Sequence, residues 1–205
     1  MILAILQARV SSSRLPGKVL KPILGKEMLL RQIERIQYSN MIDKLVVATS
    51  TNASDDAIEE MCQDNNIKVF RGDLNNVLDR FYQCARQYNP KHVVRLTGDC
   101  PLADWQVIDQ TIQCHIKGKY DYVNNRSKPA FPDGLDVEVI TYSALKSSYD
   151  NAVLPSEKEH VTYYVKNRKD KFKLGYFYSA KDLSHMRWTV DKPEDFILVE
   201  RIYKN

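Results

Sequence analysis

Apolar runs of strand length alternate with amphipathic stretches along the first half of the chain. The apolar runs are residues 2–6, 44–49, 67–70 and 92–97. Apolar residues at helical spacing follow each run, in residues 28–36, 54–65, 77–85 and from Asp104 onward. Because a helix follows each strand, this pattern predicts an α/β fold with three layers, α/β/α, around a mostly parallel, doubly wound, Rossmann-like sheet.

The expected helices begin at residues suited to helix starts. Asp104 precedes one helix and either Ser54 or Asp55 precedes another, and such side chains accept hydrogen bonds from the first free N–H groups. Pro193 suits the first turn of a closing helix. The second half is otherwise less regular: it predicts strands over 120–125, 135–142, 172–179 and 187–190, and a helix over 157–168.

Composition narrows the class of protein. The 205 residues are 43% hydrophobic and 27% charged, which is typical of a globular chain. The net charge of +4 comes without a dense Lys/Arg tract, which argues against nucleic acid as a partner. The apolar N-terminal run is too short for a signal peptide, and no apolar span of about 18 residues follows. We therefore expect a cytoplasmic protein with no membrane partner.

The four cysteines lie far apart and form no CxxC pair. They are Cys62, Cys84, Cys100 and Cys114. Their spacing argues against a zinc site and against a disulfide framework. We expect three of them to serve as small buried apolar side chains in a reducing compartment.

The segment QARVSSSRLPGK, residues 7–18, follows the first predicted strand. It fits neither the dinucleotide-binding nor the Walker A pattern. Small residues at 11–13 let backbone N–H groups approach oxygen atoms closely. Arg9, Arg14 and Lys18 supply three positive charges suited to phosphate groups. Ligands of open α/β sheets bind beyond the carboxyl ends of the strands, so this loop predicts a triphosphate site rather than a solvated surface loop.

Two carboxylates also follow predicted strands. Asp99 comes after the strand at 92–97, and Asp191 after the one at 187–190. Each has an alternative role in local structure, Asp99 in an Asx-type turn and Asp191 as the cap of the last helix. Facing a basic loop, the pair would suit Mg²⁺, which takes one or two protein carboxylates together with phosphate oxygens.

Six motifs together resemble those of the sugar cytidylyltransferases, the superfamily of the CMP-sialate and CMP-Kdo synthetases, and within it the SpsF branch of spore-coat polysaccharide biosynthesis. They are ILQARVSSSRLPGKVLKPILGKEML (5–29), VFRGDLNNVLDRFYQCA (69–85), VVRLTGDCPLAD (93–104), FPDGLDVEVIT (131–141), EKEHVTYYV (157–165) and RWTVDKPEDFILV (187–199), in the family's order along the chain. Tyr163 departs from the proline that relatives often carry.

The resemblance implies CMP transfer from CTP to an acidic sugar, with release of pyrophosphate and with Mg²⁺ as cofactor. It implies a nucleotide-diphospho-sugar transferase fold in one domain over 1–205: a nucleotide-binding half (1–118), a sugar-binding and dimerisation part (119–186), and a closing strand and helix (187–205). The implied catalytic residues are Arg9, Arg14, Lys18 and Asp99, and the metal ligands Asp99 and Asp191. Nucleotide-binding residues would be Leu6, Gln7, Ala8, Arg9, Ser13, Arg14, Lys18, Arg71, Gly72, Thr97 and Gly98. Substrate-binding residues would be Asp133, Gly134, Asp136, Glu138, Glu159, His160 and Arg187.

Alternatives stay open at this point. The acceptor can be a sugar 1-phosphate or another phosphorylated small molecule, with GTP or CTP as donor, or the chain can bind a nucleotide sugar without catalysis. Asp99, Asp191 or a metal-bound hydroxide can be the base. The acids of 133–138 suit a sugar acid poorly unless they bind hydroxyls or an amine. Relatives suggest a homodimer through 120–180, whose tyrosines can instead floor the sugar pocket.

Overall fold

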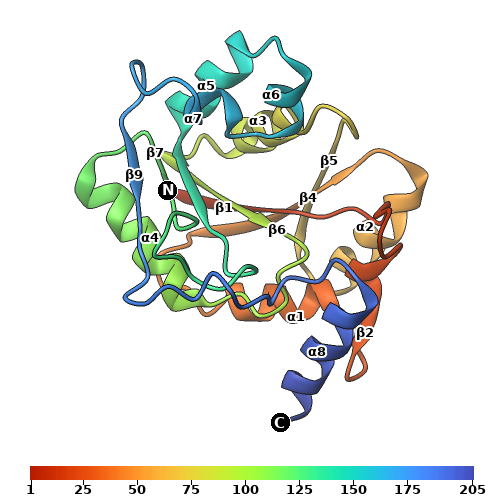
Figure 1. Cartoon of the computed structure of the whole chain (residues 1–205). Helices are drawn as coiled ribbons and strands as arrows, with labels where there is room; N and C mark the ends of the chain where they lie inside the picture. Colours follow the sequence, from red (N-terminus) through yellow and green to blue (C-terminus); the bar gives the residue numbers. More distant parts are fainter.

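A seven-stranded sheet forms the centre of the computed structural model, which describes all residues 1–205 (Figure 1). Its strand order is β5-β4-β1-β6-β8-β7-β9. The strands are β1 (Ile2–Gln7), β4 (Lys44–Ser50), β5 (Lys68–Gly72), β6 (His92–Thr97), β7 (Tyr122–Asn124), β8 (Glu138–Thr141) and β9 (Leu174–Tyr176). Only β8 runs antiparallel to its neighbours, so the predicted mostly parallel sheet is confirmed.

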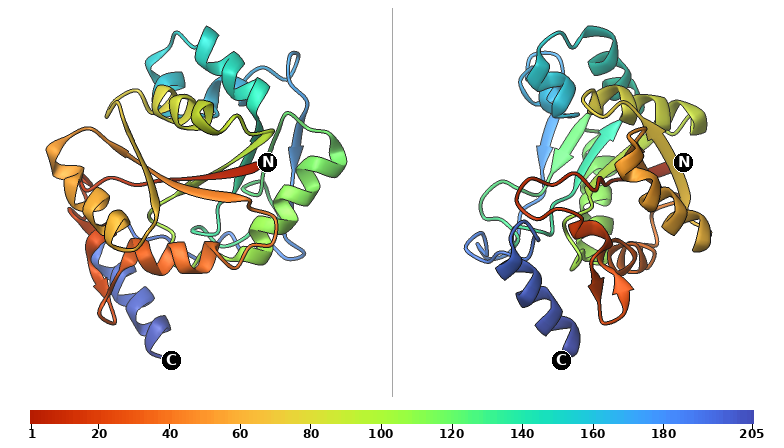
Figure 2. Two further views of the ribbon diagram at one scale, coloured as in Figure 1. Left: turned by 180° about the vertical axis from the view of Figure 1, so that it is seen from behind. Right: turned by 90° about the vertical axis from the view of Figure 1, so that its right-hand side faces the viewer.

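Helices cover both faces of this sheet. They are α1 (Met28–Ile36), α2 (Asp56–Asp64), α3 (Val77–Tyr88), α4 (Trp105–Gly118), α5 (Tyr142–Asn151), α6 (Pro155–Glu159), α7 (Tyr163–Lys166) and α8 (Pro193–Lys204), with two 3₁₀ turns, η1 (Lys18–Leu20) and η2 (Ala53–Asp55), and a short hairpin of β2 (Pro22–Ile23) and β3 (Lys26–Glu27). Helices α1, α2 and α4 lie on one face, and α3, α5 and α7 on the other (Figures 1 and 2). Helix α8 projects from the α1 side.

Strand β1 shows why the central strands are apolar throughout. Ala4 and Leu6 pack into the core layer beneath α1, whereas Leu3 and Ile5 pack into the layer beneath α3. All four side chains are fully buried. A parallel strand covered by helices on both faces buries both of its sides, so its sequence is a continuous apolar run rather than an alternating one.

Three predictions about the second half are wrong. Residues 187–190 form no strand but a loop, whose one β-bridge joins Arg187 to Asp133. The strand predicted over 135–142 begins only at Glu138, and Tyr142 starts α5, which the sequence did not predict because few apolar side chains mark its buried face. The helix predicted over 157–168 is two short helices, α6 and α7.

Helix capping follows the sequence in part. Asp104 caps α4 as predicted, since its carboxylate accepts from the N–H groups of Gln106 and Val107. The predicted cap at Ser54 or Asp55 is wrong: Asn52 caps the preceding turn η2, and the Asp55 carboxylate makes no capping bond to α2. It accepts hydrogen bonds from Val10, in the loop after β1, and from Ser50 at the end of β4.

The cysteines are free, and Cys62, Cys84 and Cys100 are buried, as predicted. None of the helices is both long and apolar enough to span a membrane.

A buried histidine makes the fold sensitive to acid. His115 on α4 is 1% exposed and lies with Nε2 3.0 Å from Nδ1 of His92. Burial, and then the neighbouring His92, lower the pKa of His115 from 6.5 to about 4. Between these values the unfolded chain binds a proton that the folded chain does not, so this residue's contribution to stability is lost as pH falls below 6.5.

The unfolding free energy of the parent protein falls between pH 7.5 and pH 5. We expect this fall to be smaller by roughly 2 kcal/mol in His115→Gln. Urea denaturation at the two pH values measures this difference. His185→Gln, at an exposed histidine, is the control and leaves the pH dependence unchanged. An equal pH dependence in His115→Gln and the parent protein would contradict the assignment.

Candidate active site

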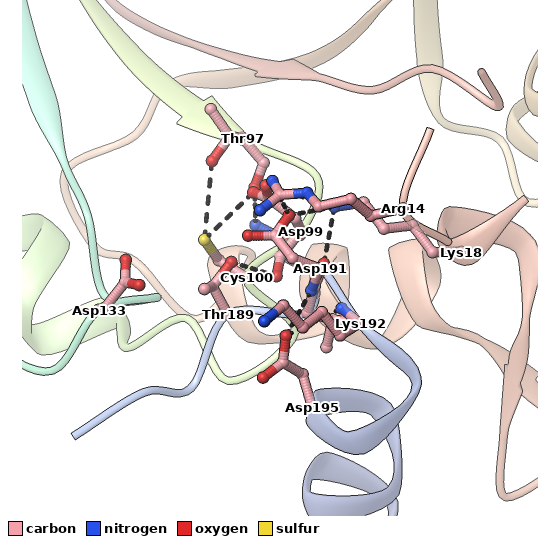
Figure 3. A network of polar contacts seen from close by, with 12 residues as sticks. Arg14, Lys18, Thr97, Asp99, Cys100, Asp133, Thr189, Asp191, Lys192 and Asp195 are labelled. Atoms are coloured by element: carbon pink, nitrogen blue, oxygen red, sulfur yellow. Dashed lines mark hydrogen bonds and ion pairs between the residues drawn. The ribbon is translucent and has the colours of Figure 1, made fainter. Parts of the chain in front are cut away.

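Asp99 and Asp191 are brought together by backbone hydrogen bonds between distant parts of the chain. Asp99 follows β6, and Asp191 precedes α8. The Val190 N–H donates to the Asp99 carbonyl at 2.8 Å, and the Thr189 hydroxyl donates to the same oxygen at 3.2 Å. The loop before α8 is thereby fixed against the carboxyl end of β6, as Figure 3 shows.

Gly134 allows the loop before α8 to pack closely against the backbone of residues 133–134. It has φ +111°, and a Cβ atom at this position would lie 2.5 Å from the backbone N of Thr189. The neighbouring Asp133 carbonyl accepts from the N–H groups of Trp188 and Thr189, at 2.6 and 3.0 Å. Gly134, predicted as substrate-binding, therefore supports the loop that carries Asp191, and a larger residue would strain both the turn and this contact.

Neither the Asp99 nor the Asp191 carboxylate is occupied by the local structural role, turn or helix cap, that the sequence allowed for it. The N–H groups at the start of α8 are capped by Asp195, which accepts from Asp191 and Lys192, each at 2.9 Å. The Asp99 carboxylate accepts only a weak bond from the Cys100 thiol, at 3.4 Å. Both carboxylates are therefore free to face the basic loop.

Lys18 and Arg14 meet the carboxylates from the loop after β1 (Figure 3). The Lys18 ammonium lies 3.0 Å from Asp191 Oδ1 and 3.6 Å from Asp99 Oδ2, and donates to the Val190 carbonyl at 2.6 Å. Arg14 lies 2.9 Å from Asp191. Burial alone would raise the pKa of Asp191, but hydrogen bonds from Lys18 and Arg187 hold it below its ordinary value. Asp191 is thus a carboxylate that stays ionised.

A polar cavity of about 220 Å³ lies along this loop. It is lined by Gln7, Ala8, Arg9, Ser12, Ser13, Arg14, Lys18, Val19, Thr97, Gly98, Asp99 and Asp191. Most of the nucleotide-binding residues predicted from the sequence are in this set, and Ser12 and Val19 are additions. Gly98 fits because a Cβ there would lie 3.0 Å from the Gln7 carbonyl, to which its own N–H donates at 2.7 Å. We refer to this space as the nucleotide cavity.

Three predicted nucleotide-binding residues lie outside the nucleotide cavity. Leu6 is fully buried in the core. Arg71 turns toward α2, with its guanidinium 2.6 Å from Asp56 and 2.8 Å from Glu59. Gly72 packs against Arg80, whose side chain a Cβ at position 72 would meet at 2.9 Å. Arg71 also donates to the carbonyls of Ser50 and Asn52, and so stabilises the turn after β4.

Asp55 anchors the loop, a function that the sequence reasoning missed. Its side chain is fully buried. The carboxylate accepts from the Val10 N–H at 2.7 Å, and from the N–H and hydroxyl of Ser50 at 3.1 and 2.5 Å. It thus joins the middle of the loop to the carboxyl end of β4. The only signal in the sequence was an aspartate near a helix start, which is typical of a cap.

A second polar cavity, of about 330 Å³, opens on the other side of the carboxylates. It is lined by Arg95, Thr97, Asp99, Cys100, Arg126, Asp133, Asp136, Glu138, Thr189 and Asp191. Thr97, Asp99 and Asp191 line both cavities. Figure 3 shows Asp133 on the side of these residues away from Arg14 and Lys18. We refer to this space as the acceptor cavity.

Glu138 is the most enclosed acid of the acceptor cavity. Arg95, Lys166, Tyr122 and Thr162 all bond its carboxylate. Burial would raise the pKa of Glu138, but the charges of Arg95 and Lys166 more than compensate and lower it. This carboxylate is therefore a fixed part of the cavity wall.

The remaining predicted substrate-binding residues lie at different distances from this cavity. The Arg187 guanidinium lies 2.6, 2.7 and 3.2 Å from the carboxylates of Asp133, Asp191 and Asp195, and so stabilises the edge of the cavity. Glu159 and His160 are exposed and lie outside both cavities. Glu159 lines a separate cavity of about 570 Å³, to which Arg9 also contributes.

These features together define a class of enzyme. Three cations suited to a triphosphate follow the first strand of the parallel sheet. The carboxylates of Asp99 and Asp191 lie between these cations and a second polar cavity. A donor phosphate and an acceptor can meet at such a pair, which is the arrangement of a nucleotidyltransferase.

Comparison with known proteins identifies the family. A sequence model described as cytidylyltransferase matches residues 3–205, and the chain belongs to this family. The uncharacterized protein MJ1063 of Methanocaldococcus jannaschii is 35% identical, over 100% of this chain and 84% of that protein. The spore coat polysaccharide biosynthesis protein SpsF of Bacillus subtilis is 33% identical, over 99% and 86%.

Solved structures agree with this assignment. A cytidylyltransferase from Leptospira borgpetersenii has a TM-score of 0.93 at 34% identity, covering 100% of this chain and 87% of that one. A CMP:2-keto-3-deoxy-manno-octonic acid synthetase complexed with CTP has a TM-score of 0.77 at 16% identity, covering 99% and 98%. The second likeness concerns the fold, and confirms the nucleotide-diphospho-sugar transferase type.

We expect Asp55→Asn to weaken CTP binding about tenfold, or ~1.4 kcal/mol, because the amide cannot accept all the bonds that fix the loop. Calorimetric titration with CTP measures this, and a thermal unfolding curve shows that the variant is folded at the titration temperature. Asp56→Asn is the matched control, since the neighbouring carboxylate contacts Arg71 and not the loop. Equal CTP affinity in Asp55→Asn and Asp56→Asn would refute the anchoring role.

Proposed function

We propose that this cytidylyltransferase transfers CMP from CTP to an oxygen atom of a sugar and releases pyrophosphate. The observation that carries the proposal is the meeting of the nucleotide and acceptor cavities at Asp99 and Asp191. The name of SpsF connects that relative to polysaccharide biosynthesis, and the synthetase of the same fold is complexed with CTP. Both support a sugar acceptor and CTP as the donor.

In the proposed reaction the loop after β1 binds the triphosphate. The backbone at Gln7 and Ala8 lies beside the base, and Arg9, Arg14 and Lys18 neutralise the phosphates. The acceptor oxygen attacks the α-phosphorus from the acceptor cavity, and the bond from the α-phosphorus to the bridging oxygen breaks in line. Pyrophosphate leaves with the electron pair of that bond, stabilised by the cations of the loop.

Asp99 and Asp191 suit Mg²⁺. Their oxygens already hold a cation, the Lys18 ammonium, at 3.6 Å from Asp99 and 3.0 Å from Asp191. No group of three or more His, Cys, Asp or Glu side chains is arranged to hold a metal ion, so phosphate oxygens and water would have to supply the other ligands, as Mg²⁺ prefers. When bound there, Mg²⁺ supplies charge neutralisation at the reacting phosphates. Lys18 and Arg14 would then be available to contact the phosphates.

A hydroxyl acceptor must also lose its proton. Asp99 and Asp191 are the carboxylates that line both cavities, and therefore lie nearest to the point where acceptor and donor meet. Either can take the proton when it is not neutralised by Lys18 or by metal.

The nucleotide and the carboxylate pair can be tested together. The protein is incubated with Mg²⁺, one nucleotide and each sugar of a panel in turn. We expect pyrophosphate release when the nucleotide is CTP, and none with GTP, UTP or ATP. We expect Asp99→Asn to lower kcat by about 10²–10³-fold, because losing one preorganised charge has an effect of this size in other enzymes. The Kd for CTP changes little. Turnover with GTP alone would reject CTP as the donor. Nucleotide-sugar binding without pyrophosphate release, unchanged in Asp99→Asn, would favour a non-catalytic protein.

Asp64→Asn is the control for that experiment. Asp64 is exposed at the end of α2, away from both cavities, and its replacement leaves kcat unchanged.

We also propose a homodimer formed through residues 120–180. Tyr163, Tyr176 and Tyr178 expose 41%, 37% and 47% of their surfaces there, and exposed tyrosines are enriched at protein interfaces. Sedimentation equilibrium would then give twice the mass of one chain, and Tyr176→Asp would shift the equilibrium toward monomer. Tyr38→Asp, at an exposed tyrosine outside the segment, is the control. A monomer at all concentrations would reject the dimer.

A further inference from the structure

Arg187 lies beside the carboxylate pair, yet it lines neither the nucleotide cavity nor the acceptor cavity. Its guanidinium group donates to Asp133 Oδ2 at 2.6 Å, to Asp191 Oδ2 at 2.7 Å and to Asp195 Oδ1 at 3.2 Å. Because the side chain reaches neither cavity, any effect of Arg187 on the reaction has to pass through one of these carboxylates. Asp191 is the one that lines both cavities and lies at the point where donor and acceptor meet.

The two oxygens of the Asp191 carboxylate have different partners. Oδ1 lies 3.0 Å from the Lys18 ammonium and 2.9 Å from the Arg14 guanidinium, both in the loop after β1. Oδ2 lies 2.7 Å from Arg187, four residues earlier in its own segment. Oδ1 is therefore the oxygen that faces the nucleotide cavity and its cations, whereas Oδ2 is already held by the protein.

The contact between Arg187 and Asp191 is part of a fixed arrangement. The backbone of Arg187 forms a bridge with Asp133, whose carbonyl accepts from the Trp188 N–H at 2.6 Å. Asp195 holds the Arg187 Nε with one oxygen and accepts from the Asp191 N–H with the other, at 2.9 Å. An isolated exposed ion pair contributes little, but a planar guanidinium that bonds three carboxylates at once has its orientation fixed by all of them.

The number of oxygens that a carboxylate offers affects which cation it suits. Mg²⁺ is small, requires a nearly octahedral arrangement of ligands and keeps several waters. Ca²⁺ accepts more oxygen ligands in a flexible geometry, and often takes both oxygens of one carboxylate. A carboxylate with one oxygen held by an arginine therefore suits the smaller ion, and one that is free to offer both oxygens suits the larger ion better.

We propose that Arg187 is a positioning residue that keeps Asp191 Oδ2 occupied, so that Asp191 offers a single oxygen to a metal ion and the site favours Mg²⁺ over Ca²⁺. This inference rests on the proposed CMP transfer and on Asp99 and Asp191 as the ligands of its metal ion. Arg187 acts on the choice of cation through Asp191 and contacts neither the nucleotide nor the acceptor. Removing its side chain frees Oδ2 and reduces the discrimination between the two ions.

The affinity for a CTP analogue whose α,β-bridge is methylene tests the proposal. Calorimetric titration gives its Kd in excess Mg²⁺ and again in excess Ca²⁺, and the ratio of the two Kd values is compared between variants. Both ions carry the same charge, so the loss of a positive side chain affects both titrations alike and cancels in the ratio. We expect Arg187→Met to shift this ratio about tenfold in favour of Ca²⁺, which is the size of effect that loss of a hydrogen-bond partner of a metal ligand has elsewhere.

Two further variants separate the position of Arg187 from general effects. Arg201→Met removes the same side chain from an exposed position on α8 and leaves the ratio unchanged. Asp195→Asn keeps one oxygen to accept the Asp191 N–H, but its amide nitrogen cannot accept from the Arg187 Nε. We expect this variant to shift the ratio about threefold in the same direction, as the loss of one hydrogen bond predicts. Asp195→Asn decides the question if Arg187→Met does not fold.

An unchanged ratio in Arg187→Met, or the same shift in Arg201→Met, would overturn the proposal and leave Arg187 with a structural role in the loop. If Arg187→Met is unfolded, an unchanged ratio in Asp195→Asn has the same consequence. Equal binding of the analogue by the parent protein in Mg²⁺, in Ca²⁺ and without a divalent ion would reject the choice of cation while CTP binding stands. Failure of the parent protein to bind the analogue under all three conditions would count against the proposed CMP transfer itself.

Discussion

The position of Lys18 between Asp99 and Asp191 is the contact on which the geometry of the active site depends. Its ammonium group is nearly buried, yet it reaches two carboxylates and the Val190 carbonyl. Two carboxylates held this close repel each other, and a cation between them removes that repulsion. The lysine thereby stabilises the close approach of the two carboxylates.

The scaffold around this contact is built from backbone hydrogen bonds and one buried acid. Val190 donates to the carbonyl of Asp99, and so joins the loop before α8 to the end of β6. Asp55 joins the loop after β1 to the end of β4. Ends of parallel strands lie along one edge of a sheet, so these two anchors place the cations and the carboxylates within reach of each other. Charged side chains on such anchored loops need little reorganisation when substrates bind.

The two cavities divide the chemistry between them. On one side, the lining carries the positive charges of Arg9, Arg14 and Lys18, the last two paired with Asp191. On the other, each guanidinium group already faces a carboxylate. The two spaces are lined by different side chains except where they meet, at Thr97 and the carboxylate pair.

Apolar periodicity by itself determined the strands and helices of the first half, because β1, β4 and β6 are buried on both faces and their helices have clear apolar faces. The spacing of cations after β1 likewise predicted a phosphate site, and these cations do line one cavity. Tertiary structure alone decided that residues 187–190 form a loop, that Asp55 anchors another loop instead of capping a helix, and which acids are neutralised. These features depend on contacts between distant residues, which no local pattern in the sequence records.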